Sequence, residues 1–173
     1  MATPDFVLSL REAVGTAPLW LSGVTAVVTR GDDVLLVRRA DTGAWTPVTG
    51  IVDPGEHPAD AAVREVLEEA DVAAEPLRLA AVGVTDVVVY GNGDRASYLD
   101  HTFALRWVAG EPSPADGENT EARWFSRDAL PPMSDEMLGR IEAGLSREVG
   151  ARFTAAGEPR GGATGRQDAP TGP

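Results

Sequence analysis

The chain has 173 residues, of which 43% are hydrophobic and 6% aromatic, a composition typical of a single globular domain with short extensions. Its formal net charge is −12 and all of its basic residues are arginine, so binding along a long nucleic acid, which relies on clustered cations, is not expected. No apolar run is long enough to span a bilayer, the N-terminus does not resemble a secretory signal, and the absence of cysteine excludes disulfides; we therefore expect a cytoplasmic protein without membrane contact.

The first part of the chain predicts a helix, a hairpin and a further strand. Residues Pro4–Val14 place apolar side chains near one helical face. Val24–Arg30 and Val34–Arg39 are β-branched or aliphatic runs separated by Gly31-Asp32-Asp33, which predicts a hairpin. Thr46–Val52 is the next candidate strand.

The second part predicts another hairpin, a short strand and a helix. Leu77–Tyr90 and Ser97–Val108 are long apolar runs on either side of Gly91-Asn92-Gly93-Asp94, a turn-forming sequence. Ala122–Phe125 is a short strand, and Asp135–Val149 has apolar residues at helical spacing. Hairpins with helices between and after them predict α+β layering, in which a mixed sheet carries helices on its faces.

The same patterns divide the chain into three parts. We expect residues 1–19 to form an N-terminal helical extension and residues 20–150 to form the only folded domain. Residues 155–173 contain Gly, Pro, Ala and polar side chains without periodicity, which indicates a disordered tail.

The most informative segment is Gly50–Val72, which contains a predicted helix at Pro58–Ala70. Proline suits the first helical turn, where its missing N–H is not needed. One helical face is apolar and is expected to pack on the sheet: Val63, Val66, Leu67 and Ala70. The opposite face is expected to present three carboxylates: Glu65, Glu68 and Glu69. These would repel one another unless a divalent cation binds them; a solvated acidic face is the alternative interpretation.

Residues 50–72 read GIVDPGEHPADAAVREVLEEADV and resemble the signature of the Nudix hydrolase family, G-x5-E-x7-R-E-U-x-E-E-x-G-U, where U is a bulky aliphatic residue. Asp71 stands where the family has glycine, but aspartate tolerates a left-handed helix cap better than most residues. Thr49 also departs from the more usual glycine-rich loop. The positions in register are Gly50, Glu56, Arg64, Glu65, Val66, Glu68, Glu69 and Val72. The similarity extends over roughly residues 20 to 133.

This resemblance implies an α/β/α sandwich with a mixed sheet and a metal-dependent pyrophosphohydrolase. The substrate would be a nucleoside diphosphate linked to another moiety: a nucleoside triphosphate, a nucleotide sugar such as ADP-ribose, or a dinucleoside polyphosphate. The implied cofactor is Mg2+, with Mn2+ as an alternative. The implied ligands are the carbonyl of Gly50 with Glu65, Glu68 and Glu69, and either Glu65 or Glu69 would act as general base.

Further residues receive roles by similarity to MutT-like members of the family. Glu118 is the candidate for an additional metal ligand from a loop, with Glu121 and Asp116 as alternatives. Arg39 resembles a substrate-contacting arginine. Glu56 and Arg64 are expected to form an ion pair that fixes the loop before the helix.

Aromatic side chains are candidates for stacking on a nucleobase, with packing in the core as the alternative: Trp45, Tyr90 and Tyr98. The expected partner is a small nucleotide, and a homodimer is an open possibility for the assembly. A non-catalytic, nucleotide-sensing domain is the alternative function, although retention of all three helix glutamates argues against it.

Overall fold

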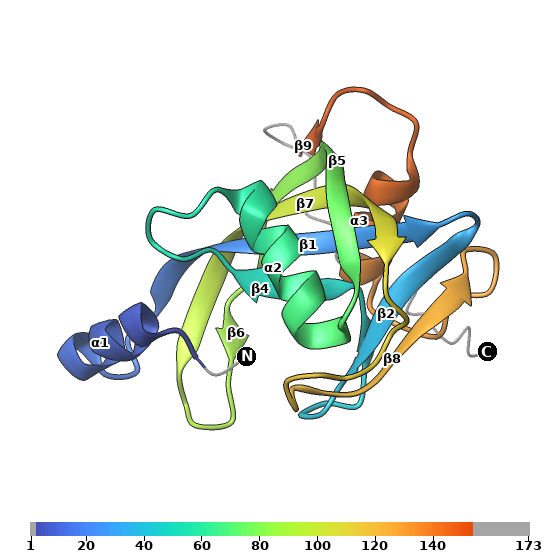
Figure 1. Cartoon of the computed structure of the whole chain (residues 1–173). Helices are drawn as coiled ribbons and strands as arrows, with labels where there is room; N and C mark the ends of the chain where they lie inside the picture. Colours follow the sequence, from blue (N-terminus) through green and yellow to red (C-terminus); the bar gives the residue numbers. More distant parts are fainter. Residues whose placement is uncertain (1–2, 154–173) are drawn as a thin grey trace, which may run out of the picture.

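The computed structural model describes residues 3–153, so the predicted tail at 155–173 lies outside the described residues. Figure 1 shows the arrangement of its helices and strands. The elements are α1 (Asp5–Val14), β1 (Leu19–Arg30), β2 (Asp33–Arg39), β3 (Trp45–Thr46), β4 (Val48–Ile51), α2 (Pro58–Ala70), β5 (Ala73–Val84), β6 (Val88–Val89), β7 (Arg95–Ala109), β8 (Asn119–Ser126), α3 (Asp135–Leu145) and β9 (Arg152–Phe153). None of the described helices has the length and apolar character needed to cross a membrane.

The strands form one mixed sheet with β1 at its centre. The main path runs β3-β2-β1-β7-β5-β9, while β4 pairs with β1, β6 with β7 and β8 with β2. β1 and β7 are parallel, whereas β1 pairs antiparallel with both β2 and β4. The sheet confirms the predicted mixed α/β architecture and both predicted hairpins.

The two longer helices cover opposite faces of this sheet (Figure 1). Alternate residues of β1 point to opposite sides, as the strand geometry requires. Val24 and Val28 pack in one core cluster with Val66 of α2. Val27, between them in sequence, packs in a second cluster with Ile141 of α3. The fold is therefore the expected α/β/α sandwich.

Several predicted boundaries change for identifiable reasons. The strand predicted at 46–52 is divided at Pro47, which has no N–H to donate to a ladder. The run predicted to continue to Tyr90 is interrupted after Val84, where the hydroxyl of Thr85 accepts the hydrogen bond from the N–H of Tyr98, and it resumes as β6.

At the C-terminal end, α3 stops at Leu145, four residues before the predicted end, and β9 was not predicted. The guanidinium of Arg78 donates to the carbonyl oxygens of Ala143 (2.7 Å) and Ser146 (2.5 Å), so a side chain from β5 satisfies the acceptors that a further helical turn would have used.

The predicted orientation of α2 was wrong in part. Leu67, expected on the packed face, is 53% exposed. Glu65 and Glu69, expected to face away from it, are each only 1% exposed, while Val66 and Ala70 are buried as expected. Two carboxylates therefore lie on the sheet side of the helix, and only Glu68 of the three is exposed.

Asp71 ends α2 in the left-handed conformation predicted for it, with φ 54° and ψ 35°, and its N–H donates to the carbonyl of Leu67. A side chain in this region is strained relative to glycine. We expect Asp71→Gly to raise the free energy of unfolding by about 0.5–1 kcal/mol, or roughly 1–4 °C in Tm, and Asp71→Ala to lower it. Thermal denaturation of the two variants measures this, and a glycine variant that melts below the alanine variant would contradict it.

Candidate active site

Glu65 lies directly against the backbone of Gly50. A Cβ placed on Gly50 would be 2.0 Å from the carboxyl carbon of Glu65, so this contact requires glycine. Oε1 of Glu65 accepts a hydrogen bond from Arg64 at 3.0 Å. Oε2 is buried and has no hydrogen-bond partner among the described residues. An unpartnered carboxylate oxygen at this depth is costly unless a ligand completes it.

Glu69, one helical turn further, is held by an amide from another strand. Its Oε2 accepts a hydrogen bond of 2.8 Å from Nδ2 of Asn119, the first residue of β8, which is 4% exposed. Sequence reasoning missed Asn119. Its position directly after Glu118 is the one feature of the sequence that could have drawn attention to it. No sequence pattern connects it to a helix residue 50 positions earlier.

Burial dominates the ionisation of both glutamates. Loss of hydration raises the pKa of Glu65 to about 8, opposed by the charge of Arg64 and assisted by that of Glu69. Loss of hydration likewise raises the pKa of Glu69 to about 7; the Asn119 hydrogen bond opposes this rise and the charge of Glu118 adds to it. Both carboxyl groups therefore lie where the protein itself only partly compensates a negative charge.

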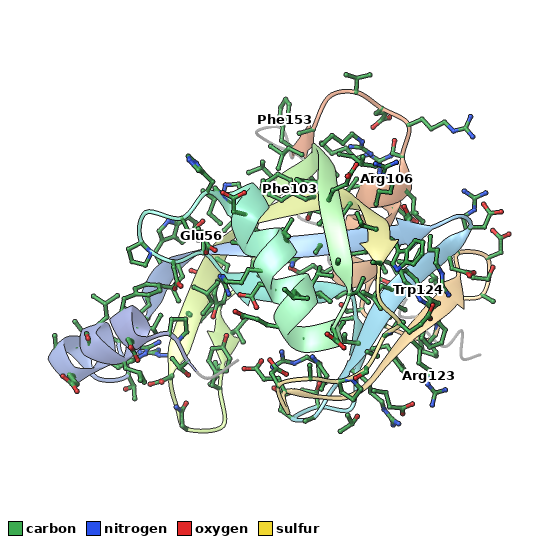
Figure 2. All side chains as sticks on the ribbon, viewed as in Figure 1. Glu56, Phe103, Arg106, Arg123, Trp124 and Phe153 are labelled. Atoms are coloured by element: carbon green, nitrogen blue, oxygen red, sulfur yellow. The ribbon has the colours of Figure 1, made fainter. Side chains whose placement is uncertain are left out.

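Arg64 connects this helix to the preceding loop. Its Nε and Nη2 donate to the two carboxylate oxygens of Glu56, each at 2.9 Å, and Nη2 also donates to the carbonyl of Ile51 at 3.1 Å. The Glu56 carboxylate accepts from the N–H of Asp53. Hydrogen bonding by Arg64 lowers the pKa of Glu56. The predicted Glu56–Arg64 ion pair is therefore present, and Glu56 stands on the loop that leads into α2 (Figure 2).

Replacing Arg64 with Lys should separate the contribution of its positive charge from that of its hydrogen-bond geometry. Lysine keeps the positive charge but cannot make the two-pronged contact with Glu56. We expect kcat/KM to fall about 10- to 100-fold, the usual loss when an orienting contact to a charged group of a site is removed, together with a lower Tm. Arg127→Lys is the matched control, because the guanidinium of Arg127 forms an exposed ion pair with Asp32. Equal activities of the two variants would refute the orienting role of Arg64.

A cleft of about 610 Å3 opens beside the two buried glutamates. Glu65, Glu69 and Gly50 line it together with Arg39, Glu118, Tyr90 and Tyr98. Two predicted residues, Trp45 and Glu68, are not part of its lining. Trp45 instead packs edge-on against Phe125, with ring centroids 4.8 Å apart, so the structure supports its packing interpretation rather than a nucleobase platform.

Arg39 and Glu118 face each other across one side of the cleft. Nη1 of Arg39 lies 3.5 Å from Oε2 of Glu118, and Nη2 lies 3.2 Å from Oδ2 of Asp41. The alternative acid Glu121 pairs with Arg38 and does not line the cleft. The charges of Glu118 and Asp116 both raise the pKa of Glu69, but of the three loop acids considered Glu118 is the one that lines the cleft.

The donor set of this cleft fits a hard divalent cation. Among residues 3–153, no three acidic or imidazole groups already converge as a formed ion site. However, the buried unpartnered oxygen of Glu65, the position of this carboxylate against the backbone of Gly50 and the all-oxygen chemistry of the neighbouring groups match what Mg2+ requires. Arg64 and Arg39 lie beside these acidic side chains and partly balance their negative charge.

The fold and this glutamate-lined cleft define a protein of the Nudix class. Residues 20–146 match the model of the NUDIX domain, and the chain belongs to that family. It is 35% identical over 134 residues to the NAD-capped RNA hydrolase NudC of Pseudomonas syringae pv. syringae, a match that covers 72% of this chain but 44% of that protein. The chain thus accounts for less than half the length of this curated relative.

Solved structures agree with this assignment. A NUDIX hydrolase from Nitrosomonas europaea superposes with a TM-score of 0.59 at 27% identity, covering 72% of this chain and 88% of that one. An ADP-ribose pyrophosphatase from Streptococcus suis gives a TM-score of 0.56 at 26% identity, covering 78% and 98%.

Proposed function

We propose that this protein is a divalent-metal-dependent pyrophosphohydrolase that cleaves the phosphoanhydride bond of a nucleoside diphosphate linked to another moiety. The observation that carries the proposal is the Glu65 carboxylate, buried over Gly50 with one oxygen unpartnered among the described residues, at the wall of a nucleotide-sized cleft. A side chain held in this costly state is what a site completed by a cation and a phosphate requires.

Glu65, Glu69 and Glu118 and the carbonyl of Gly50 would hold the ion; Glu68, which lies outside the cleft lining but shares Arg64 with Glu65, stays a predicted ligand. We propose Mg2+, with Mn2+ as the alternative, because these cations accept carboxylate, carbonyl and phosphate oxygens. When bound, the cation supplies positive charge to the diphosphate and acidifies water.

The chain's own residues orient the reactants. Asn119 fixes one oxygen of Glu69, and Arg64 fixes Glu65, so both carboxylates point in defined directions. Either Glu65 or Glu69 then takes the proton of the attacking water. Arg39, which lines the cleft beside Glu118, is placed to bind a phosphate oxygen.

The relatives and the cleft support the proposed substrate class. The related proteins are named for ADP-ribose and for NAD-capped RNA, and both compounds contain a diphosphate that joins adenosine to a second moiety. A volume of about 610 Å3 suits a small nucleotide. We propose such a nucleotide as substrate; exclusion of long nucleic acids, a cytoplasmic location and a homodimer stay predictions.

A substrate panel tests the proposal. ADP-ribose, NADH, nucleoside triphosphates and a diadenosine polyphosphate would be incubated with the full chain and Mg2+ or Mn2+, and the products separated by chromatography. We expect a nucleoside monophosphate from at least one compound, and none when EDTA is present. Nucleotide-induced thermal stabilisation without any product would favour the nucleotide-sensing alternative instead.

A further inference from the structure

The cleft extends well beyond the glutamates, to a second wall built by α1 and the hairpin of β6 and β7. Val7 and Arg11 of α1 and Tyr90 and Tyr98 of the hairpin line this end. Because α1 precedes residues 20–146, this wall includes a part of the chain outside the matched family domain. Figure 1 shows α1 beside the first part of β1 and the β6–β7 hairpin.

Apolar packing and one arginine fix α1 in this position. Val7 is 5% exposed and packs with Leu21 and Ala96. Phe6 is partly buried and packs against the same cluster, whereas Leu10 and Val14 are exposed, so only two side chains of α1 make its apolar contact with this cluster. The helix therefore depends on polar contacts as well.

Arg11 supplies those contacts. Its side chain is 12% exposed and donates to the carbonyl oxygens of Ala17 at 2.6 Å and Arg95 at 2.7 Å. Nε of Arg11 lies 3.4 Å from Oδ2 of Asp94 in the hairpin turn. In return, Arg95 donates to the carbonyl of Thr16. These reciprocal contacts tie α1 and its following loop to the hairpin.

The hairpin presents a supported aromatic ring to the cleft. The hydroxyls of Tyr90 and Tyr98 share a hydrogen bond of 2.5 Å. Tyr98 is partly buried and packs over Gly23, where an added Cβ would be 3.3 Å from its ring. Tyr90 is 40% exposed and its N–H is fixed by the carbonyl of Asp94. A ring that is held by its hydroxyl but open on its surface is suited to stacking.

The positions of the charged side chains determine which part of a nucleotide can bind at this end of the cleft. In the proposed function the phosphates lie at the glutamates and Arg39, whereas the guanidinium of Arg11 already donates to carbonyl oxygens and has Asp94 beside it. An uncharged, planar group is therefore the part of a nucleotide that fits between α1 and the tyrosines.

We propose that α1 and the β6–β7 hairpin form the nucleobase site of the cleft, with Tyr90 as the stacking residue and Arg11 as the residue that positions the hairpin. This inference rests on the proposed function, since it assigns the base-bearing half of the proposed substrate. It places a determinant of substrate affinity in a helix outside the matched domain.

Binding of AMP, UMP and ribose 5-phosphate to the full chain with Mg2+, measured by titration calorimetry, tests the stacking role. Ribose 5-phosphate differs from the two nucleotides only by the missing base. We expect the base to tighten binding about tenfold in the wild type, Tyr90→Ala to remove this difference, and Tyr90→Phe to keep most of it. Val89→Ala is the matched control, because Val89 is 65% exposed and does not line the cleft.

Arg11→Ala tests the positioning role, with Arg11→Lys as the conservative variant. We expect KM for the best nucleotide substrate to rise about five- to tenfold while kcat stays within twofold, with partial recovery in the lysine variant. Hydrogen exchange in residues 5–17 should become faster. A fall in kcat as large as the rise in KM, or no change in either constant, would overturn the positioning role.

The two proposals fail in different ways. A wild type that binds both nucleotides no more tightly than ribose 5-phosphate, or a Tyr90→Ala variant that keeps the wild-type preference, would overturn the nucleobase site and leave metal-dependent hydrolysis intact. Absence of any product across the substrate panel would overturn the proposed function, and with it this inference.

Discussion

Replacing Glu69 with Gln is expected to reduce kcat by about 10²- to 10⁴-fold, the usual range for loss of a general base or an equivalent group. Glutamine preserves the shape of the side chain, and its carbonyl oxygen still accepts the hydrogen bond that Asn119 donates at 2.8 Å. The change therefore removes a charge without opening a cavity. Steady-state hydrolysis of the best panel substrate, with Mg2+ titrated, measures the loss.

Stability measurements show whether the Glu69→Gln variant loses activity through the missing carboxylate or through unfolding. At pH 8 wild-type Glu69, whose pKa burial raises to about 7, is ionised in both the folded and the unfolded protein, so its burial opposes folding. Without divalent cation, Glu69→Gln should melt no lower than the wild type at this pH. With Mg2+, it should gain less stability than the wild type.

An exposed glutamate provides the control for this comparison. Glu142→Gln in α3 removes the same charge from a solvent-exposed position and should keep the wild-type rate and response to Mg2+. A Glu69→Gln variant that turned over as fast as Glu142→Gln would remove Glu69 from the catalytic machinery.

The sequence predicts the local features of α2 well because each has a local cause. Pro58 begins the helix and Asp71 ends it, and both effects act within one turn of the residue concerned. The ion pair of Glu56 and Arg64 spans eight residues and was also within reach of sequence spacing.

The burial of Glu65 could not be predicted from the sequence, because helical periodicity assigns charged residues to the solvent-exposed face. The sheet can accept a carboxylate at this position only because Gly50 has no side chain. Similarly, Asn119 meets Glu69 only after β8 pairs with β2, a contact between distant segments. Reading Gly50 and Glu65 as partners, rather than as separate members of a motif, would have predicted the buried face.

The N-terminal helix illustrates the same limit. Its existence follows from apolar spacing, but its position depends on Arg11 reaching main-chain oxygens in β7 and the loop before β1. Carbonyl acceptors carry no signature in a sequence, since every residue has one. The wall that α1 adds to the cleft therefore becomes visible only in three dimensions.

Gly50→Ala is expected to lower kcat/KM by at least about 100-fold, the loss associated with displacing a catalytic group by about 1 Å. The new Cβ would lie 2.0 Å from the carboxyl carbon of Glu65 and 2.3 Å from its Cγ, so this side chain, which is 1% exposed, would have to leave its buried position and move toward the cleft. The backbone of Gly50 has no positive φ, so alanine is excluded by this neighbour alone. Overpacking of this kind lowers the free energy of unfolding by about 1–3 kcal/mol.

Gly83→Ala controls for the loss of a strand glycine, since Gly83 in β5 has no atom within 4 Å of the added Cβ and no positive φ. A double-mutant cycle then identifies the cause. In a Glu65→Ala background the collision partner is gone, so Gly50→Ala should cost about 0.5 kcal/mol or less, whereas independent effects would add. Stability would be measured by urea denaturation. An equal loss in the wild-type and Glu65→Ala backgrounds would show that Gly50 is required for some reason other than its contact with the Glu65 carboxylate. The predicted non-additivity instead makes the two residues one unit: the glycine is needed because the carboxylate must lie on the backbone of β4.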